Sequence, residues 1–256
     1  MERKIGIDTG KYMTKAAMRR IDGTDRLLEF RTKVDTLEMD GGVMLNPAES
    51  HVVELNGRRY VVGEAAHSTD IRETTKASDI HRIAAYTAVA MLVDSGDEVD
   101  IAMGCPLSVF TMRERVAEYR EYIFPGDCHI TIVVDGMKKS FHIKSAQVIP
   151  EGSGVILLDP ERYGDGVCGV IDIGGLNCNC MMVRNSYPVL RSMFTNSIGG
   201  SDLYMRIRRR LQATLETELM DEVLEQDIIR GYDIADREKS SRIISECKEE
   251  QVMYSF

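Results

Sequence analysis

The first third of the chain alternates apolar and polar residues, a period that predicts β-strands with one buried face. Three such stretches follow one another closely, over Lys4–Asp8, Met13–Arg20 and Leu27–Thr32. The Asp22-Gly23 pair between the second and the third is a turn signal. We therefore predict that the chain opens with a meander of three antiparallel strands.

Two further hairpins are marked by dipeptides that favour type I′ turns. Asn56-Gly57 and Asp135-Gly136 each separate two strand-like stretches, which cover residues 51–55 and 59–62 and residues 130–134 and 140–143. The first of these hairpins follows an irregular stretch that contains Gly41-Gly42. The irregular stretch and the Asn56-Gly57 hairpin are together expected to form a small insertion at about residues 33–75.

Later segments show helical spacing of their apolar residues. One helix is predicted between Ser78 and Ser95, with Gly96 as a natural C-cap. A second is predicted over Thr111–Phe124, with Thr111 as its N-cap. A third begins at Ser201, where leucine or isoleucine recurs at positions 203, 207, 211 and 215.

The remaining segments complete an alternation of strands and helices. Val99–Gly104 is a predicted strand between the first two helices, and Pro188–Asn196 is a predicted strand before the third. Residues 216–256 are charged and predicted to be helical, with breaks at Gly231 and Asp233. Strands alternating with helices in this way predict an α/β protein.

One short pattern occurs twice and carries the candidate chemistry. Val167–Ile173 is predicted to be a buried strand that pairs with Asn177–Val183, and Asp172, Gly174 and Gly175 lie where the two strands meet. Two glycines leave room for a ligand against the backbone, whose N–H groups can bind an anion, and the carboxylate can hold a hydrated Mg²⁺ beside it. Taken alone, the pattern also fits a plain hairpin.

The second copy favours a duplicated domain with one phosphate clamped between its halves. Asp8-Thr9-Gly10 matches Asp172-Ile173-Gly174, again between two strands. Lys15 follows this turn and could neutralise a phosphate, the alternative being a solvated lysine.

Two other positions could act on a nucleotide. Glu151 follows a strand that ends at Pro150, and a carboxylate there could accept a bond from an attacking water. From the residues alone a solvated loop glutamate is the favoured interpretation. The glycines 199 and 200 before Ser201 suit an anion or a ribose at a helix start.

Composition and charge narrow the class of protein. The chain has 256 residues, of which 43% are hydrophobic and 29% charged, as in ordinary globular proteins. Its net charge of −9 opposes broad binding to nucleic-acid phosphates, and no apolar run approaches the length of a membrane span. The six cysteines form no Cys-x-x-Cys pair and are expected to be buried reduced thiols, consistent with a cytoplasmic protein.

Two other features have structural interpretations that we favour. His81 is expected to lie on the surface of its helix rather than to act in catalysis. The arginines at 206, 208, 209 and 210 are expected to form a solvated face, with an acidic partner surface as the alternative.

Six short motifs occur in a specific order and spacing. They are Ile-Asp-Thr-Gly at 7–10 with Lys15, Leu-Asn-Gly at 55–57 with Tyr60, Val-Asp-Ile at 99–101 with Pro106-Leu107, Ile-Pro-Glu at 149–151, Ile-Asp-Ile-Gly-Gly at 171–175 and Ser-Ile-Gly-Gly at 197–200. In these motifs the chain resembles the ParM-type bacterial actins of plasmid segregation. The resemblance implies the duplicated actin-like ATPase fold, which is ribonuclease H-like, with domain I at residues 1–158 and domain II at residues 159–256.

The resemblance also implies the roles of individual residues. Asp8 and Asp172 would serve Mg²⁺ and the attacking water, and Glu151 would be the hydrolytic glutamate. The nucleotide would be ATP or GTP. The residues expected to bind it are Asp8, Thr9, Gly10, Lys11, Lys15, Gly174, Gly175, Leu176, Asn177, Gly199 and Gly200.

Two features depart from the family's pattern. The family usually carries a threonine after the paired glycines, whereas Leu176 and Asn177 follow here. The family also continues with a strand, a Gly-Gly-Gly turn that packs on adenine, and a closing helix, which this sequence does not contain. We therefore expect a shortened relative whose second half is incomplete.

The expected function is ATP-dependent filament formation that segregates plasmid or phage DNA. The partners would be further copies of the chain and a separate DNA-binding adaptor, with no direct contact to nucleic acid and none to membrane. Two alternatives stay open. One is a small-molecule kinase of the same superfold, for which no loop carrying an acceptor base is evident; the other is a non-catalytic, truncated interaction protein.

Overall fold

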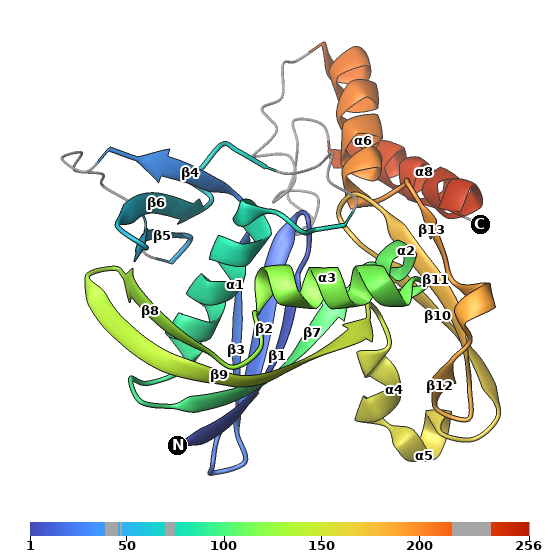
Figure 1. Ribbon diagram of the computed structural model, residues 1–256. Helices are drawn as coiled ribbons and strands as arrows, with labels where there is room; N and C mark the ends of the chain where they lie inside the picture. The colour runs from blue at the N-terminus through green and yellow to red at the C-terminus, as the bar shows by residue number, and fades with distance from the viewer. Residues whose placement is uncertain (39–45, 47, 70–74, 217–236, 256) are drawn as a thin grey trace. The chain divides into compact units, whose positions relative to one another are not determined.

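The computed structural model describes residues 1–38, 46, 48–69, 75–216 and 237–255 (Figure 1). It divides into two compact units, each made of two chain segments. Unit 1 comprises Met1–Asp172 and Asn179–Phe194, and unit 2 comprises Ile173–Cys178 and Thr195–Phe256. The domain boundary expected after residue 158 stays a prediction.

A mixed sheet is the centre of unit 1. Within the described residues it has nine strands, in the order β3-β2-β1-β7-β9-β8-β5-β6-β4. The strands are β1 Glu2–Thr9, β2 Met13–Arg19, β3 Asp25–Arg31, β4 Val34–Leu37, β5 Ser50–Leu55, β6 Arg58–Gly63, β7 Glu98–Cys105, β8 Cys128–Val134 and β9 Met137–Pro150. The predicted opening meander is confirmed, because β2 pairs antiparallel with both β1 and β3.

The middle of this sheet sets the position of the candidate site. β1 pairs parallel with β7, and β7 pairs parallel with β9. Parallel neighbours present their carboxyl ends at one edge, where ligands bind in open α/β sheets. The residues at and after the ends of β1 and β9, including Asp8 and Glu151, therefore lie at the same edge of the sheet.

The strands of the predicted insertion continue the same sheet. β5 pairs with β8, and β6 pairs with both β5 and β4. The turns at Asn56-Gly57 and Asp135-Gly136 have positive φ at both residues, as the type I′ prediction requires. Gly41 and Gly42 lie outside the described residues.

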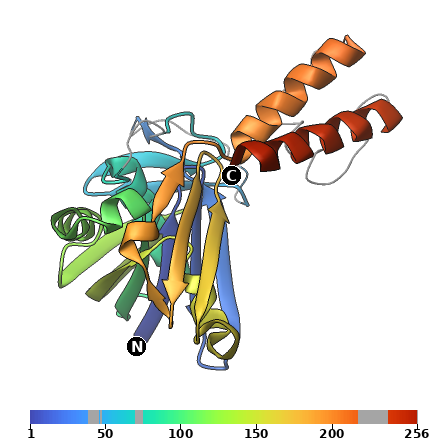
Figure 2. The same ribbon diagram turned by 90° about the vertical axis from the view of Figure 1, so that its right-hand side faces the viewer.

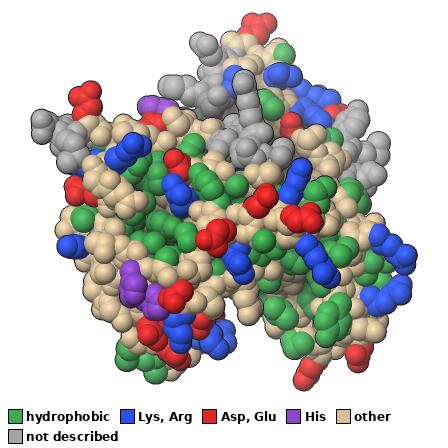
Figure 3. All heavy atoms as spheres, in the orientation of Figure 1, with side chains coloured by type: hydrophobic (Ala, Val, Ile, Leu, Met, Phe, Trp, Pro, Cys, Tyr) green, Lys and Arg blue, Asp and Glu red, His purple; other side chains and the backbone are tan. Residues whose placement is uncertain are grey.

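Five helices are described in unit 1, and the first three of them pack on the sheet. They are α1 Asp79–Leu92, α2 Leu107–Phe110, α3 Arg113–Ile123, α4 Gly154–Leu158 and α5 Pro160–Tyr163. Apolar side chains of α1 and α3, among them Ala84, Val89 and Tyr119, join those of the strands in one large buried cluster. By contrast, hydrophobic side chains gather at the surface over α4 and α5, at the lower right of Figure 3, where Leu158 is 85% exposed.

Three local predictions about these helices are wrong. The helix predicted over Thr111–Phe124 corresponds to α3, but its N-cap is Met112 rather than Thr111, and the short helix α2 before it was not predicted. The C-cap of α1 is Val93, whereas Gly96 lies further on and donates its N–H to Ser140 O. His81 is buried, 1% exposed, rather than on the surface, because the helix is enclosed on nearly all sides.

A smaller antiparallel sheet follows. Within the described residues it has four strands, β10 Val167–Ile173, β11 Cys178–Arg184, β12 Tyr187–Pro188 and β13 Phe194–Asn196. The predicted bounds of the β10–β11 hairpin are confirmed to within one residue, but the prediction that β10 is a buried strand is wrong, because Val167, Ile171 and Ile173 are 54%, 52% and 63% exposed. The strand predicted over 188–196 is instead interrupted by a 3-10 turn at Leu190–Ser192.

Unit 2 contains two helices that lie side by side, as Figure 2 shows. They are α6 Gly200–Leu215 and α8 Arg237–Ser255. Ile207 and Leu211 of the predicted apolar stripe are buried against Ile243 and Cys247. The predicted breaks at Gly231 and Asp233 lie outside the described residues.

All six cysteines are free, as expected. Four of them, Cys105, Cys178, Cys180 and Cys247, are buried as predicted, whereas Cys128 and Cys168 are only partly buried. Burial raises the pKa of the Cys105 thiol to about 12, and the nearby Glu151 carboxylate adds to the shift. A thiol held protonated in this way is a poor nucleophile and metal ligand, which supports a structural role.

Candidate functional site

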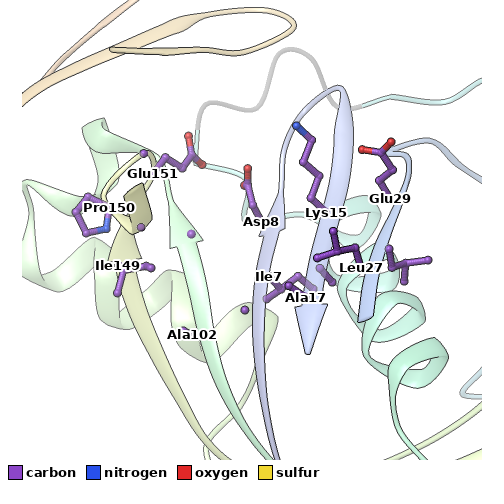
Figure 4. A pocket seen from close by; sticks show the side chains of 16 residues that line it. Ile7, Asp8, Lys15, Ala17, Leu27, Glu29, Ala102, Ile149, Pro150 and Glu151 are labelled. Carbon is purple, nitrogen blue, oxygen red and sulfur yellow. The ribbon is translucent and has the colours of Figure 1, made fainter. Parts of the chain in front are cut away.

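A pocket of about 680 Å³ opens at the edge of the unit 1 sheet, as Figure 4 shows. Asp8 of β1, Lys15 of β2 and Glu151 after β9 all line it. The first and last of these are the two carboxylates that the sequence assigned to metal binding and hydrolysis. The carboxyl ends of parallel strands therefore bring together residues 143 positions apart in the sequence.

A buried lysine joins these two carboxylates. Lys76 Nζ lies 3.3 Å from Asp8 Oδ1 and forms a very short contact with Glu151 Oε1. The Lys76 and Glu151 side chains are 5% and 6% exposed, whereas that of Asp8 is 45% exposed. The second oxygen of Glu151, Oε2, accepts a hydrogen bond of 3.0 Å from Asn179 Nδ2 on β11.

The charges of this cluster depend on one another. Burial by itself would lower the pKa of Lys76, but the negative charges of Asp8 and Glu151 outweigh it and raise that pKa above its usual range. Burial raises the pKa of Glu151, and the Lys76 charge opposes that shift. The raised pKa of Lys76 favours a charged ammonium, whereas the raised pKa of Glu151 favours a neutral carboxylic acid. We assign the ionised state, because both oxygens of Glu151 accept hydrogen bonds.

Asp172 lies one residue before the end of β10. Burial raises its pKa, and the negative charge of Asp8 raises it further. A Cβ on Gly152, which has φ +79°, would lie 3.2 Å from Asp172 Cβ. The loop after Glu151 therefore packs closely on Asp172, in a backbone conformation that favours glycine.

The exposed face of the first hairpin carries Lys15. In the strand register Lys15 lies opposite Asp8 on one side and Glu29 on the other. Its side chain is exposed and extends at the rim of the pocket (Figure 4). Its charge also lowers the pKa of Asp172, so it acts electrostatically within the cluster.

The residues of the turn between β1 and β2 differ in how far they are exposed. Thr9 is fully buried, because strand alternation directs it to the face opposite Asp8. A Cβ at Gly10 would lie 2.6 Å from Met13 O, so the turn requires glycine there. Lys11 is half-buried at the tip. A ligand at this turn would therefore contact the main chain, above all at Gly10, which has no side chain.

The second glycine turn lies in unit 2 and is closed by hydrogen bonds. Gly174 N–H donates to Asn177 O at 2.8 Å, and Gly174 O and Gly175 O accept bonds from the N–H groups of Gly200 and Ser201. Leu176, like Asn177, is half-buried. The structure therefore brings together the two predicted glycine pairs, 174–175 and 199–200.

Gly199 is the tightest position of this arrangement. A Cβ there would lie 2.5 Å from Asn177 N and 2.6 Å from Gly175 O. Its N–H donates to Asp202 Oδ2 at 2.7 Å, and Gln251 Nε2 of α8 donates to its carbonyl at 3.3 Å. Gly199 is the N-cap of α6, so the prediction of Ser201 as the cap is wrong.

The arginines of α6 are partly committed to the neighbouring helix. Arg210 pairs with Glu250 at 2.7 Å and with Glu246 at 3.7 Å, and Arg206 also pairs with Glu250 at 3.7 Å. These ion pairs join α6 to α8. They show that two members of the predicted solvated face have partners within the chain.

Sequence reasoning missed two residues of the unit 1 cluster. Lys76 precedes α1 in a stretch without a strand or glycine signal, and Asn179 is one polar residue in an apolar strand. A weak signal existed for Asn179. An amide in a strand that is otherwise buried needs a hydrogen-bond partner, and a nearby carboxylate provides one.

The donor set is suited to a hydrated metal ion. Among the residues that the structure describes, no group of three or more His, Cys, Asp or Glu side chains could hold a metal ion by itself. Mg²⁺ usually keeps several waters and binds one or two carboxylates together with substrate phosphates. Asp8 and Asp172 fit this requirement, because burial and then the negative charge of Asp8 raise the pKa of Asp172, and a cation would stabilise its ionised form.

Across the described part of the chain, every helix falls short of the length and apolar character needed to cross a membrane.

Comparison with solved structures gives the same architecture in several proteins. The Alp12 filament structure is 34% identical, over 81% of this chain and 65% of that chain, with a TM-score of 0.62. Ta0583, an archaeal actin homologue, is 19% identical, over 98% of this chain and 81% of that one, with a TM-score of 0.75. For the apo psk41 ParM protein the identity is 14%, the coverages are 100% and 80%, and the TM-score is 0.68. The chain thus spans about two thirds of Alp12, or 65% of its length.

Comparison with protein families identifies the first half of the chain. Residues 6–154, more than half of the sequence, match the N-terminal domain of actin-like proteins. A search of curated proteins gave no match. The matched segment contains the first hairpin, the nine-stranded sheet and Glu151. The expected fold is confirmed, and the chain belongs to the actin-like protein family.

Proposed function

We propose that this chain binds ATP, or GTP, with Mg²⁺, hydrolyses it, and forms filaments that segregate plasmid or phage DNA. The observation that carries the proposal is the cluster of Asp8, Glu151 and Asp172 around a lysine in a member of the actin-like family. The ammonium of Lys76 offsets part of the negative charge of these carboxylates, and a bound metal ion would offset more of it. Their proximity supports a role in metal-dependent chemistry.

The proposed division of labour follows from charge and burial. Glu151 is buried and fixed through both of its oxygens, which suits a group that orients a water and accepts its proton. Asp8 and Asp172 would hold Mg²⁺, which when bound neutralises charge on the phosphates. Lys15, exposed at the pocket rim, would contact a phosphate.

The glycine turns are proposed to hold the rest of the nucleotide. Gly10, Gly174 and Gly175, with Thr9, Lys11, Leu176 and Asn177 beside them, would offer backbone to the phosphates. Gly199 and Gly200 would lie near the nucleoside. Gly10 and Gly199 support this proposal, because at both positions a side chain would collide with backbone.

Related structures support the proposed nucleotide and the proposed filament. Ta0583 has been solved in complex with ADP, and AlfA as a filament bound to AMPPNP. Alp12 and the AlfA of a B. subtilis plasmid are described as filaments. For this chain we propose self-assembly in the cytoplasm and a separate DNA-binding adaptor, since a net charge of −9 disfavours direct contact with DNA.

The test combines light scattering, phosphate release and calorimetry on the purified chain. With Mg·ATP or Mg·GTP we expect scattering to rise and phosphate to appear, and EDTA to prevent both. Nucleotide binding without scattering or phosphate release would reduce the proposal to a non-catalytic interaction protein. Transfer of phosphate to a small-molecule acceptor would replace it with a kinase, and no binding of either nucleotide would overturn it.

A further inference from the structure

Lys76 is the most buried charge of the unit 1 cluster, and no role has yet been given to it. Its side chain is 5% exposed, and its backbone has φ +58°, a left-handed conformation that is uncommon for lysine. It lies in the connection between β6 and α1, shortly before the helix begins at Asp79. A strained backbone around a buried charge is characteristic of functional sites.

The partners of Lys76 are the two groups proposed to act on metal and water. Its ammonium contacts Asp8 at 3.3 Å and Glu151 at very short range. Asn179 holds the other oxygen of Glu151, so the carboxylate is fixed from both sides. Among these three interactions, only that of Lys76 supplies a positive charge to Glu151.

We propose that Lys76 is a positioning residue, whose ammonium holds the Glu151 carboxylate at the sheet edge in the orientation that hydrolysis needs. This inference rests on the proposed function. A lysine that acts through Glu151 affects the rate of hydrolysis but contributes little to nucleotide affinity. A lysine that only stabilises the fold would instead change binding and hydrolysis together.

The first test is a double-mutant cycle on hydrolysis and on Mg·ATP affinity. The variants are Lys76→Met, Glu151→Gln and the double variant. We expect each single change to lower the rate of hydrolysis by about 10²-fold or more, the value of a positioned base. The double variant should be no slower than Glu151→Gln, within about threefold, because residues that act as a unit are non-additive. The Kd for Mg·ATP should change by less than about threefold in Lys76→Met, well below the tenfold that 1.4 kcal/mol represents.

A matched control is Lys33→Met. Lys33 also pairs with a glutamate, Glu64, at 2.7 Å, but neither residue lines the pocket. Its rate should equal that of the parent. Rate losses that multiply in the double variant would overturn the proposal, as would a loss of affinity in Lys76→Met as large as its loss of rate.

The second test needs neither nucleotide nor a folded Lys76 variant. Brief acetylation of the ligand-free protein, read by peptide mass spectrometry, should modify the exposed Lys15 rapidly and Lys76 slowly. In Glu151→Gln we expect Lys76 to react about tenfold faster, since losing one ion-pair partner frees the amine. Equal labelling of Lys76 and Lys15 in the parent, or unchanged labelling in Glu151→Gln, would overturn the pairing. If the parent hydrolyses no nucleotide, the proposed function is wrong. The acetylation experiment then still decides whether Lys76 holds Glu151.

Discussion

The two predicted nucleotide-binding regions are built on different physical principles. In unit 1, the buried side chains of Glu151 and Lys76 and the partly exposed Asp8 are held together by charge. In unit 2, Gly174 and Gly199 are held by backbone hydrogen bonds and by the absence of side chains. The comparison teaches that equivalent glycine turns in the sequence need not be supported in equivalent ways.

The difference also predicts that substitutions in the two regions affect different properties of the protein. A charge in a low-dielectric site strongly influences its neighbours, so substitutions in unit 1 should alter reactivity first. A glycine packed against backbone leaves no room for a Cβ, so substitutions in unit 2 should alter folding first. Four substitutions test this contrast, in order of decreasing expected effect.

The largest effect is expected from Asp172→Ala. Asp172 is proposed to hold Mg²⁺ with Asp8, and each carboxylate raises the electrostatic need for the cation. Mg²⁺-dependent phosphate release should be abolished, measured with a coupled phosphate assay. Circular dichroism should confirm that the variant is folded. Phosphate release at the parent's rate would show that the charged region lacks the proposed metal site.

Glu151→Ala should come next, lowering hydrolysis by about 10²–10⁴-fold, the usual value of a positioned acid or base. Affinity for Mg·ATP, measured by calorimetry, should stay close to that of the parent. Filaments of the variant should also persist longer if disassembly follows hydrolysis. A loss of affinity as severe as that of Asp172→Ala would place Glu151 in binding rather than in hydrolysis.

Lys15→Ala should weaken ATP binding but leave adenosine binding almost unchanged. A hydrogen bond to a charged group contributes about 1.5–3 kcal/mol, or roughly ten- to a hundredfold in Kd. Calorimetry with both ligands measures the difference directly. Equal losses for ATP and adenosine would remove Lys15 from the phosphate site, and its role would then be restricted to the charge balance around Asp172.

Gly199→Ala should destabilise the protein by about 1–3 kcal/mol, the usual range for overpacking a close contact. The new Cβ would lie within 2.6 Å of three backbone atoms of the neighbouring turn. Urea unfolding followed by the ellipticity of the helices measures the change.

Its matched control is Gly200→Ala, one residue further on in α6. The nearest atom to a Cβ there is 3.7 Å away, and alanine in a helix is favoured over glycine by about 0.5–1 kcal/mol. The two adjacent alanines should therefore change stability in opposite directions. Changes of the same sign would contradict the account of Gly199 as a position closed by backbone.

Local sequence patterns determined much of the secondary structure. Period-two alternation predicted β1 to β3, and Asn56-Gly57 and Asp135-Gly136 marked the turns between β5 and β6 and between β8 and β9, because short-range sterics decide these features. Local patterns failed at element ends. Thr111 and Ser201 are good capping residues by type, but the chain bends elsewhere to satisfy packing, and Met112 and Gly199 take those positions.

The sequence by itself also determined which residues carry charge at the ends of strands, including Asp8, Glu151 and Asp172. It could not show that Lys76 joins them, because that contact spans 68 residues to Asp8 and 75 to Glu151. Only the parallel pairing of β1, β7 and β9 brings Asp8 and Glu151 to one edge of the sheet, where Lys76 contacts both and the buried Glu151 carboxylate depends on its charge. Ion pairs between residues far apart in the sequence depend on the tertiary structure, and no local pattern of residues predicts them.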